Sequence, residues 1–321
     1  MMNQSKNPLS LILKGMAMGI AEVIPGVSGG TIAFITGIYE QLIDAIKKVL
    51  SPEVFGLLKS STRTSSWQTL HGSFVLYLLS GMVIGIGIGI FGIAHLLENY
   101  PEWVWAFFFG LIVASVIFLF RQVRSWDLSK ALTLILSAAG AYWITVVQPA
   151  QGNEALWFVF GAGMIAISAL ILPGISGSFI LLLLGMYQFI LHDNLKEGLL
   201  ENQDPQALLT IFVFGLGCLT GLGTFSRVLG WMFRTWHDLT MALLTGLMLG
   251  SLNKVWPWRN VLEYRENSEG LPVPFMEESV LPQAYDKDPM VAGAVLAALI
   301  GISLVFVIEY AGKKAQKTKS A

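Results

Sequence analysis

Two short stretches of this chain combine residue types that bind anions: "PGVSGG", starting at Pro25, and "PGISGS", starting at Pro173. Proline ends a helix, and the serine that follows is placed to cap the next one. The first N–H groups of a helix have no partner within it and carry the positive end of its dipole, while glycine permits close approach. Each stretch therefore predicts a binding site for a phosphate-like group.

The candidate binding residues fall into two matching sets. The free N–H groups are expected at Gly29, Gly30 and Thr31 in the first stretch and at Gly177, Ser178 and Phe179 in the second. The full candidate sets are Pro25, Gly26, Ser28, Gly29, Gly30 and Thr31, and Pro173, Gly174, Ser176, Gly177 and Ser178.

Two ionisable residues in apolar surroundings join these candidates. Glu22 lies one turn before Pro25, and Leu170 takes its place in the second stretch. A carboxylate there is a candidate proton carrier for coupling, or it only supports packing. Arg227 is the one arginine inside a predicted membrane span. It pairs with the phosphate or with Glu22, or it reaches back to the cytoplasmic interface.

The elements that position these residues are membrane helices. The chain has 321 residues, of which 54% are hydrophobic and 13% charged, about half the charge of a soluble domain. We expect an all-α polytopic membrane protein. The predicted spans are 73–96, 103–120, 130–147, 207–232, 238–253 and 290–311.

Charged residues orient these spans. The loops 43–72 and 121–130 and the tail 312–321 are basic, whereas 254–289 is net acidic. The positive-inside rule places the basic segments, the tail 1–9 and both termini in the cytoplasm. Prolines at 272, 274 and 282 argue against regular structure in the acidic outer loop 254–289.

The two motif-bearing segments, 10–42 and 156–190, must then enter and leave the membrane on one side. A helix from Ser10 to Ile24 rises only about 22 Å, less than the roughly 30 Å hydrocarbon core. Each segment is therefore predicted to be a re-entrant helical hairpin, broken near the midplane by its motif.

The sequence also repeats itself. A shift of 148 residues aligns the two motifs and pairs Gly37 with Gly185, and a shift of 136 pairs Gly81 with Gly217 and Gly85 with Gly221. Residues 10–147 and 156–311 are thus two units, each a hairpin followed by three spans. The odd span number inverts one unit relative to the other, a pattern typical of transporters with a midplane site. Close helix packing by small residues is the simpler alternative for one motif alone.

Other chemistries have no support in the sequence. There is no His/Cys cluster for a metal, no nucleotide-binding motif and no basic nucleic-acid-binding pattern. Cys218 is the single cysteine, which excludes an intrachain disulfide. We expect no metal, no cofactor, no catalytic residue and no nucleic-acid partner; the oligomeric state is not encoded in any pattern.

The motifs carry a family resemblance. "GMAMGIAEVIPGVSGGTIAFITGIYEQLI" together with "LPGISGSFILLLLGMYQFI" resembles the DUF368 family of bacterial membrane proteins, over residues 10 to 255. The resemblance implies transport of undecaprenyl phosphate, a polyprenyl phosphate lipid, back to the cytoplasmic leaflet of the inner membrane. Its partners would be this lipid and the surrounding membrane lipids. It also implies that residues 25–31 and 173–178 are the signature segments.

Two other functions stay open. Undecaprenyl-pyrophosphate phosphatases have a similar motif with arginine, but Gly29 and Gly177 stand in that place here. Glycines supply amides without the cation or base that hydrolysis needs. A transporter of a small soluble anion, such as inorganic phosphate, would use the same midplane site.

Overall fold

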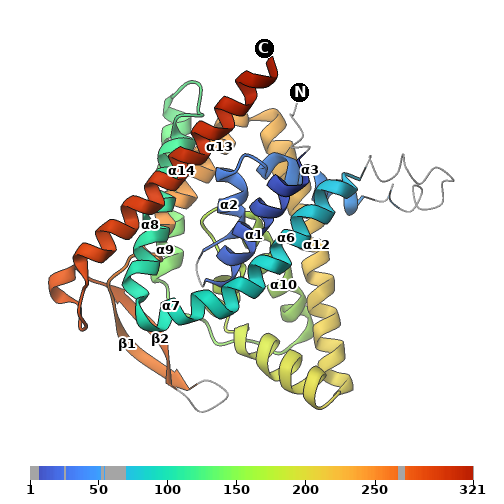
Figure 1. Ribbon diagram of the computed structural model, residues 1–321. Coiled ribbons are helices and arrows are strands. Elements are labelled where there is room, and N and C mark those ends of the chain that lie inside the picture. The colour runs from blue at the N-terminus through green and yellow to red at the C-terminus, as the bar shows by residue number, and fades with distance from the viewer. Residues whose placement is uncertain (1–6, 25–26, 52–53, 55–69, 267–271, 321) are drawn as a thin grey trace.

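The computed structural model describes residues 7–24, 27–51, 54, 70–266 and 272–320 (Figure 1). Five helical stretches in these ranges are long and apolar enough to cross a membrane. They confirm five of the six predicted spans and are Gly72–Leu97, Pro101–Phe120 (α8), Leu128–Val146 (α9), Pro205–Thr235 (α12) and Val291–Tyr310 within α14 (Val291–Ser320). The sixth, predicted at 238–253, is a 15-residue helix, α13 (His237–Ser251), and is shorter than a full span.

Both motif segments are broken helices, as predicted. The first comprises α1 (Pro8–Val23) and α2 (Gly29–Ile35), and the second α10 (Leu156–Ile171) and α11 (Gly177–Leu183). At 16 residues each, α1 and α10 are about 24 Å long, too short to span the hydrocarbon core. Pro25 and Gly26 lie outside the described residues.

The two short helices end in the same way. Gly37 and Gly185 follow α2 and α11 with φ angles of 70° and 68°, a left-handed conformation that glycine adopts without strain. The N–H of the next residue reaches back to a carbonyl five residues earlier, Ile38 to Ala33 and Met186 to Leu181. This helix ending is the Schellman motif. The pairing of Gly37 with Gly185 by the 148-residue shift therefore has a structural basis.

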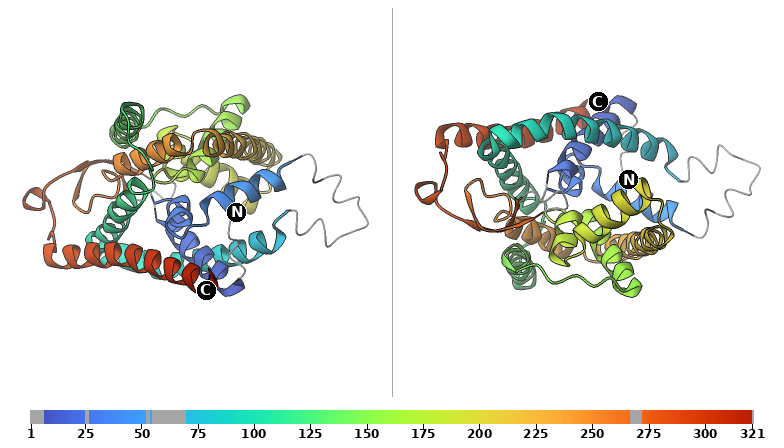
Figure 2. Two further views of the ribbon diagram at one scale, coloured as in Figure 1. Left: turned by 90° about the horizontal axis from the view of Figure 1, so that it is seen from above. Right: turned by 90° about the horizontal axis from the view of Figure 1, so that it is seen from below.

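Glycines bring the longer helices into close contact in pairs. α1 packs against α6 (Gly72–Ile88), and α10 packs against α12. α8 pairs with α14, and α9 with α13. A side chain at Gly81 or Gly217 would collide with a backbone carbonyl of the partner helix, that of Ile12 or Phe160. Figure 2 shows α2 near the centre of this arrangement, between α14 on one side and α12 and α13 on the other.

The acidic segment 254–289 contains a β-hairpin, so the expectation of irregular structure there is wrong. β1 (Arg259–Glu266) pairs antiparallel with β2 (Pro272–Ser279), with Pro274 opposite Tyr264. A two-stranded ribbon has an unpaired edge on each strand, where a proline without an N–H is tolerated. The hairpin lies at the opposite end of the molecule from the C-terminal end of α14 (Figure 1).

Side chains of residues that flank this hairpin fasten the segment to itself and to α8. Trp258 donates its indole N–H to the carbonyl of Pro289 at 2.8 Å, and Tyr285 donates its hydroxyl to the buried carboxylate of Glu102 at 2.7 Å. Burial and this hydrogen bond raise the pKa of Tyr285 above its usual range. The remaining elements are α3 (Tyr39–Val49), η1 (Gly89–Ile93), α7 (Ala94–Asn99), η2 (Phe189–Glu201) and η3 (Pro282–Ala284).

The glycine contacts predict a selective loss of stability. Gly81→Val would force α1 and α6 apart at the Ile12 carbonyl and cost about 1–3 kcal/mol. Gly87→Val on the same helix is the matched control, because a Cβ there meets nothing within 4 Å. Thermal unfolding of the detergent-solubilised protein should show a lower melting temperature only for Gly81→Val; equal temperatures for both variants would contradict this packing.

Candidate functional site

The two motif segments contact each other in the interior. The Ser28 hydroxyl lies 3.1 Å from the carbonyl oxygen of Leu170 and 3.3 Å from that of Leu172, and it donates to this pair. In return, the N–H of Gly174 donates to the Thr31 hydroxyl at 2.9 Å. Ser28 and Thr31 are 1% and 0% exposed, so these bonds are shielded from solvent. The structure thus brings together the two sets of residues that the sequence predicted as one site.

A third contact closes the same junction. Tyr39, at the start of α3, donates its buried hydroxyl to the carbonyl of Ile171 at 3.0 Å. With the bonds from Ser28, it satisfies carbonyls at the end of α10, where the helix leaves them without partners. Sequence reasoning did not select Tyr39, although the 148-residue shift pairs it with Tyr187.

In the first motif the predicted free N–H groups are already occupied. The N–H of Gly29 donates to the Glu22 carboxylate, with 2.7 Å between N and Oε1. The N–H of Gly30 donates to the Ser28 hydroxyl at 3.1 Å, and that of Thr31 to the Ser28 carbonyl. The predicted serine cap is therefore confirmed here. The expectation of free amides is wrong for this motif, because an internal carboxylate takes the place of the anion.

The second motif is arranged differently. Ser176 occupies the position before α11 but makes no capping bond; its hydroxyl pairs with that of Ser178 at 2.8 Å. Within the described part of the chain, no hydrogen bond occupies the N–H groups of Gly177, Ser178 and Phe179. With Leu170 in the place of Glu22, this motif has no internal carboxylate.

A small cavity adjoins the second motif. Its volume of about 10 Å³ gives room for roughly one water molecule. Its polar lining residues are Thr145, Ser176, Ser251 and Lys254, and the others are Ala141, Ile144, Gly174, Ile175 and Phe179. A phosphate group would enter only if these walls moved apart.

Lys254 was missed by the sequence reasoning. It lies three residues after the end of α13, at the β-hairpin end of the molecule. The segment 254–289 is net acidic but also contains Arg259, Arg265 and Lys287, so the charge pattern did not single out Lys254.

Arg227 lies elsewhere. Its guanidinium donates to the carbonyl of Gly223 at 2.7 Å and to that of Leu50, just after α3, at 2.8 Å. Among the described residues its hydrogen bonds reach neither Glu22 nor either motif. This position corresponds to the alternative in which the side chain reaches toward the interface.

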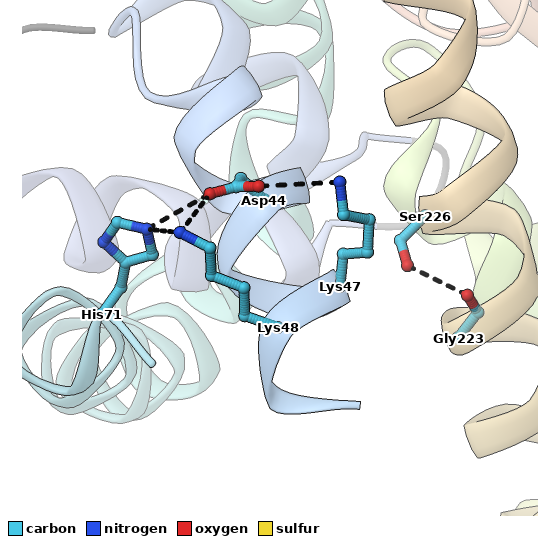
Figure 3. A network of polar contacts seen from close by, with 6 residues as sticks. All are labelled: Asp44, Lys47, Lys48, His71, Gly223 and Ser226. Atoms are coloured by element: carbon cyan, nitrogen blue, oxygen red, sulfur yellow. Dashed lines mark hydrogen bonds and ion pairs between the residues drawn. The ribbon is translucent and has the colours of Figure 1, made fainter. Parts of the chain in front are cut away.

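α3, which ends just before the Leu50 carbonyl that Arg227 contacts, also presents a polar network (Figure 3). The carboxylate of Asp44 lies 2.9 Å from Lys48, 3.7 Å from Lys47 and 3.2 Å from the ring of His71. Burial raises the pKa of Asp44, but these partners outweigh it and hold that pKa below its usual value. The network ties α3 to the start of α6. In the described ranges, no group of three or more His, Cys, Asp or Glu side chains is arranged to hold a metal ion.

These features define a multi-pass helical membrane protein in which two broken segments meet in the interior. The chain belongs to the VCA0040-like family, described as undecaprenyl phosphate translocase-like, whose model matches residues 18–273. The resemblance identified from the motifs is therefore confirmed.

Two relatives carry the same name. The chain is 42% identical over 286 residues to a polyprenyl-phosphate transporter of Vibrio cholerae, covering 89% of this chain and 90% of the relative. It is 32% identical over 266 residues to a polyprenyl-phosphate transporter of Staphylococcus aureus, covering 77% of this chain and 85% of the relative. No solved structure matches the chain.

The junction between the motifs predicts a specific loss. Thr31→Val keeps the shape of the side chain but removes the acceptor of the buried Gly174 N–H, at a cost of about 1–3 kcal/mol. Thr31→Ser retains the hydroxyl and serves as control. The melting temperature should fall clearly further for valine than for serine; the reverse order would show that this bond does not hold the motifs together.

Proposed function

We propose that this chain translocates undecaprenyl phosphate, a polyprenyl phosphate lipid, across the bacterial cytoplasmic membrane and so returns it to the cytoplasmic leaflet. The observation that carries the proposal is the relative named polyprenyl-phosphate transporter, which is 42% identical over nearly the whole chain. The buried junction of two interrupted helices supports it, because transporters commonly bind their substrates at such breaks.

The chemistry of the substrate fits two parts of the molecule. A phosphate cannot cross hydrocarbon unassisted, since burying its charge without partners costs many kcal/mol. The N–H groups of Gly177, Ser178 and Phe179, which no hydrogen bond occupies within the described residues, supply donors along this path. The polyprenyl tail is apolar and needs no enclosure, so it remains in the lipid beside the protein.

Two apolar grooves suit such a tail. One follows α6 and has a volume of about 450 Å³; the other follows α12 and has a volume of about 470 Å³. Leu76, Leu79 and Val83 line the first groove. The 136-residue shift aligns them with Phe212, Gly215 and Leu219, which line the second groove. Equivalent grooves in the two repeats would allow either repeat to bind the tail of the lipid.

The proposed architecture is a pair of inverted repeats with re-entrant hairpins, 10–42 and 156–190. Helix pairing supports it. Counting elements in order, α8 and α9 of the first unit correspond to α13 and α14 of the second. If each helix is replaced by its counterpart in the other unit, the α8–α14 pair becomes the α13–α9 pair. Both of these pairs pack closely in the structure. Inversion of this kind permits alternating access to one central site. The proposed orientation places both termini in the cytoplasm.

Glu22 is the proposed coupling residue. Its carboxylate accepts the N–H of Gly29, the group predicted to bind phosphate, so the two anions compete for one donor. A proton on Glu22 would weaken its hold on that N–H and admit the phosphate. Substrate entry and proton binding would thereby be linked.

Leaflet exchange of the lipid is the direct test. Proteoliposomes with labelled undecaprenyl phosphate are treated with an impermeant reagent that reports the accessible fraction. We expect protein-dependent loss of protection, faster under an imposed proton gradient. A rate equal to that of empty liposomes would refute translocation; phosphate release from undecaprenyl pyrophosphate, or uptake of inorganic phosphate, would then favour the enzyme or the soluble-anion transporter.

Substitution of Glu22 tests the coupling separately. Glu22→Gln preserves a hydrogen-bond acceptor for Gly29 but cannot exchange a proton. We expect exchange by this variant to continue but to lose its dependence on pH and on the proton gradient. Glu40→Gln, an exposed carboxylate at the start of α3, is the control. If the pH profile of Glu22→Gln is unchanged, Glu22 does not carry the coupling proton and only supports packing.

A further inference from the structure

Two cations share one carboxylate at the hairpin end of the molecule. The Nζ of Lys254 lies 3.6 Å from Oε2 of Glu277, and Nη1 of Arg259 lies 3.2 Å from the same oxygen. Arg259 opens β1 and Glu277 belongs to β2, so the hairpin supplies two of the three groups. Arg259 also donates to the backbone carbonyl of Lys254 at 3.1 Å, which ties the strand to the end of α13.

This cluster carries one positive charge in excess and is largely shielded from solvent. The side chains of Arg259 and Lys254 are 10% and 18% exposed. The Nε of Arg259 is buried and has no hydrogen-bond partner in the described part of the chain. A buried donor and an unneutralised buried charge are both costly, so the cluster would be stabilised by a second anion.

The pKa of Lys254 reflects the same imbalance. Burial lowers it to about 8 and the neighbouring charge of Arg259 adds to the shift, while Glu277 opposes it. Burial likewise lowers the pKa of Arg259. Lys254 is therefore charged below about pH 8 and loses its proton above it, unless an anion binds beside it.

Lys254 also faces the second motif. Its side chain lines the cavity that Ser176 and Ser251 share, and its Nζ lies 4.7 Å from the ring centroid of Phe179 in α11. The excess charge thus adjoins the one motif that lacks an internal carboxylate. The first motif, by contrast, already has Glu22 at Gly29.

We propose that Lys254 and Arg259 form an anion-binding entrance at the hairpin end, which receives a phosphate monoester and delivers it to Ser176 in the second motif. Glu277 is the resident counter-ion, and the incoming phosphate takes its place beside the two cations. The inference rests on the proposed function and deepens it, because it gives the substrate headgroup a cationic ligand on the outer side. The same chemistry fits a lipid headgroup or free inorganic phosphate, and the test separates these sources.

The test measures binding to the purified full-length chain in lipid nanodiscs. The probes are farnesyl phosphate, farnesol and inorganic phosphate; the variants are Lys254→Gln, Lys254→Arg and Lys287→Gln. Lys287 is an exposed lysine of the same loop and is the matched control. We expect Lys254→Gln to weaken farnesyl phosphate binding about tenfold or more, equivalent to about 1.4 kcal/mol, and to leave farnesol binding unchanged.

The pH profile separates an ionic role from a structural one. Phosphate monoesters are already dianions above about pH 7.5. Between pH 7.5 and 9.5 the affinity of the unmodified chain should fall as Lys254 deprotonates, whereas Lys254→Arg should hold its affinity. Arg259 and Glu277 are the ionisable groups in contact with Lys254 and are the same in both proteins.

Each outcome decides a separate point. Equal farnesyl phosphate affinity in Lys254→Gln and the unmodified chain would overturn the entrance and leave the proposed function standing. If farnesyl phosphate does not bind but inorganic phosphate binds and is lost in Lys254→Gln, the entrance holds with free phosphate as its ligand, and the lipid substrate is refuted. If neither phosphate binds the unmodified chain, the entrance is overturned.

Discussion

The rest of this structure depends on the exchange of hydrogen bonds between the two broken segments. A helix interrupted inside a membrane exposes backbone groups that lipid cannot satisfy, each at a cost of several kcal/mol. Here the carbonyls at the end of α10 accept from Ser28 and Tyr39, and the N–H of Gly174 finds the hydroxyl of Thr31. The second break therefore depends on the first segment, which supplies the partners of its carbonyls and of the Gly174 N–H. The enclosing helix pairs hold the two together.

The two motifs lie in unlike electrostatic surroundings. The first has the Glu22 carboxylate at its N–H groups, while the second adjoins a cavity lined by Lys254. Near-identical sequences therefore carry an internal anion on one side and an excess cation on the other. For a phosphate passing between leaflets, such a difference would favour entry at the second motif and release at the first. The β-hairpin gains a role in this scheme, since it supplies Arg259 and Glu277.

Local sequence rules predicted the parts of the fold that local physics decides. Proline and glycine in apolar runs predicted both helix breaks, and Ser28 caps α2 as expected. The same rule failed at Ser176, whose hydroxyl finds Ser178 instead, because a cap competes with nearby hydroxyls that a spacing rule does not weigh.

Contacts between distant segments were beyond such rules. The bond from Gly29 to Glu22 depends on how α1 and α2 fold back on each other, and the Lys254–Glu277 pair depends on a β-hairpin whose prolines argued against strands. Arg227 was selected because an arginine in a span is unusual, yet its partners are the carbonyls of Gly223 and Leu50. Residue type alone did not predict which partners this arginine would have.

Access to the second motif from both sides of the membrane is the most direct measurement. A single cysteine at Ser178→Cys, with Cys218→Ser, is exposed to an impermeant maleimide in vesicles of each orientation, and Lys287→Cys reports the sidedness. Alternating access predicts labelling at position 178 from both sides and protection from both by polyprenyl phosphate. Labelling from one side alone, with or without the lipid, would contradict a central site that opens in turn to each leaflet.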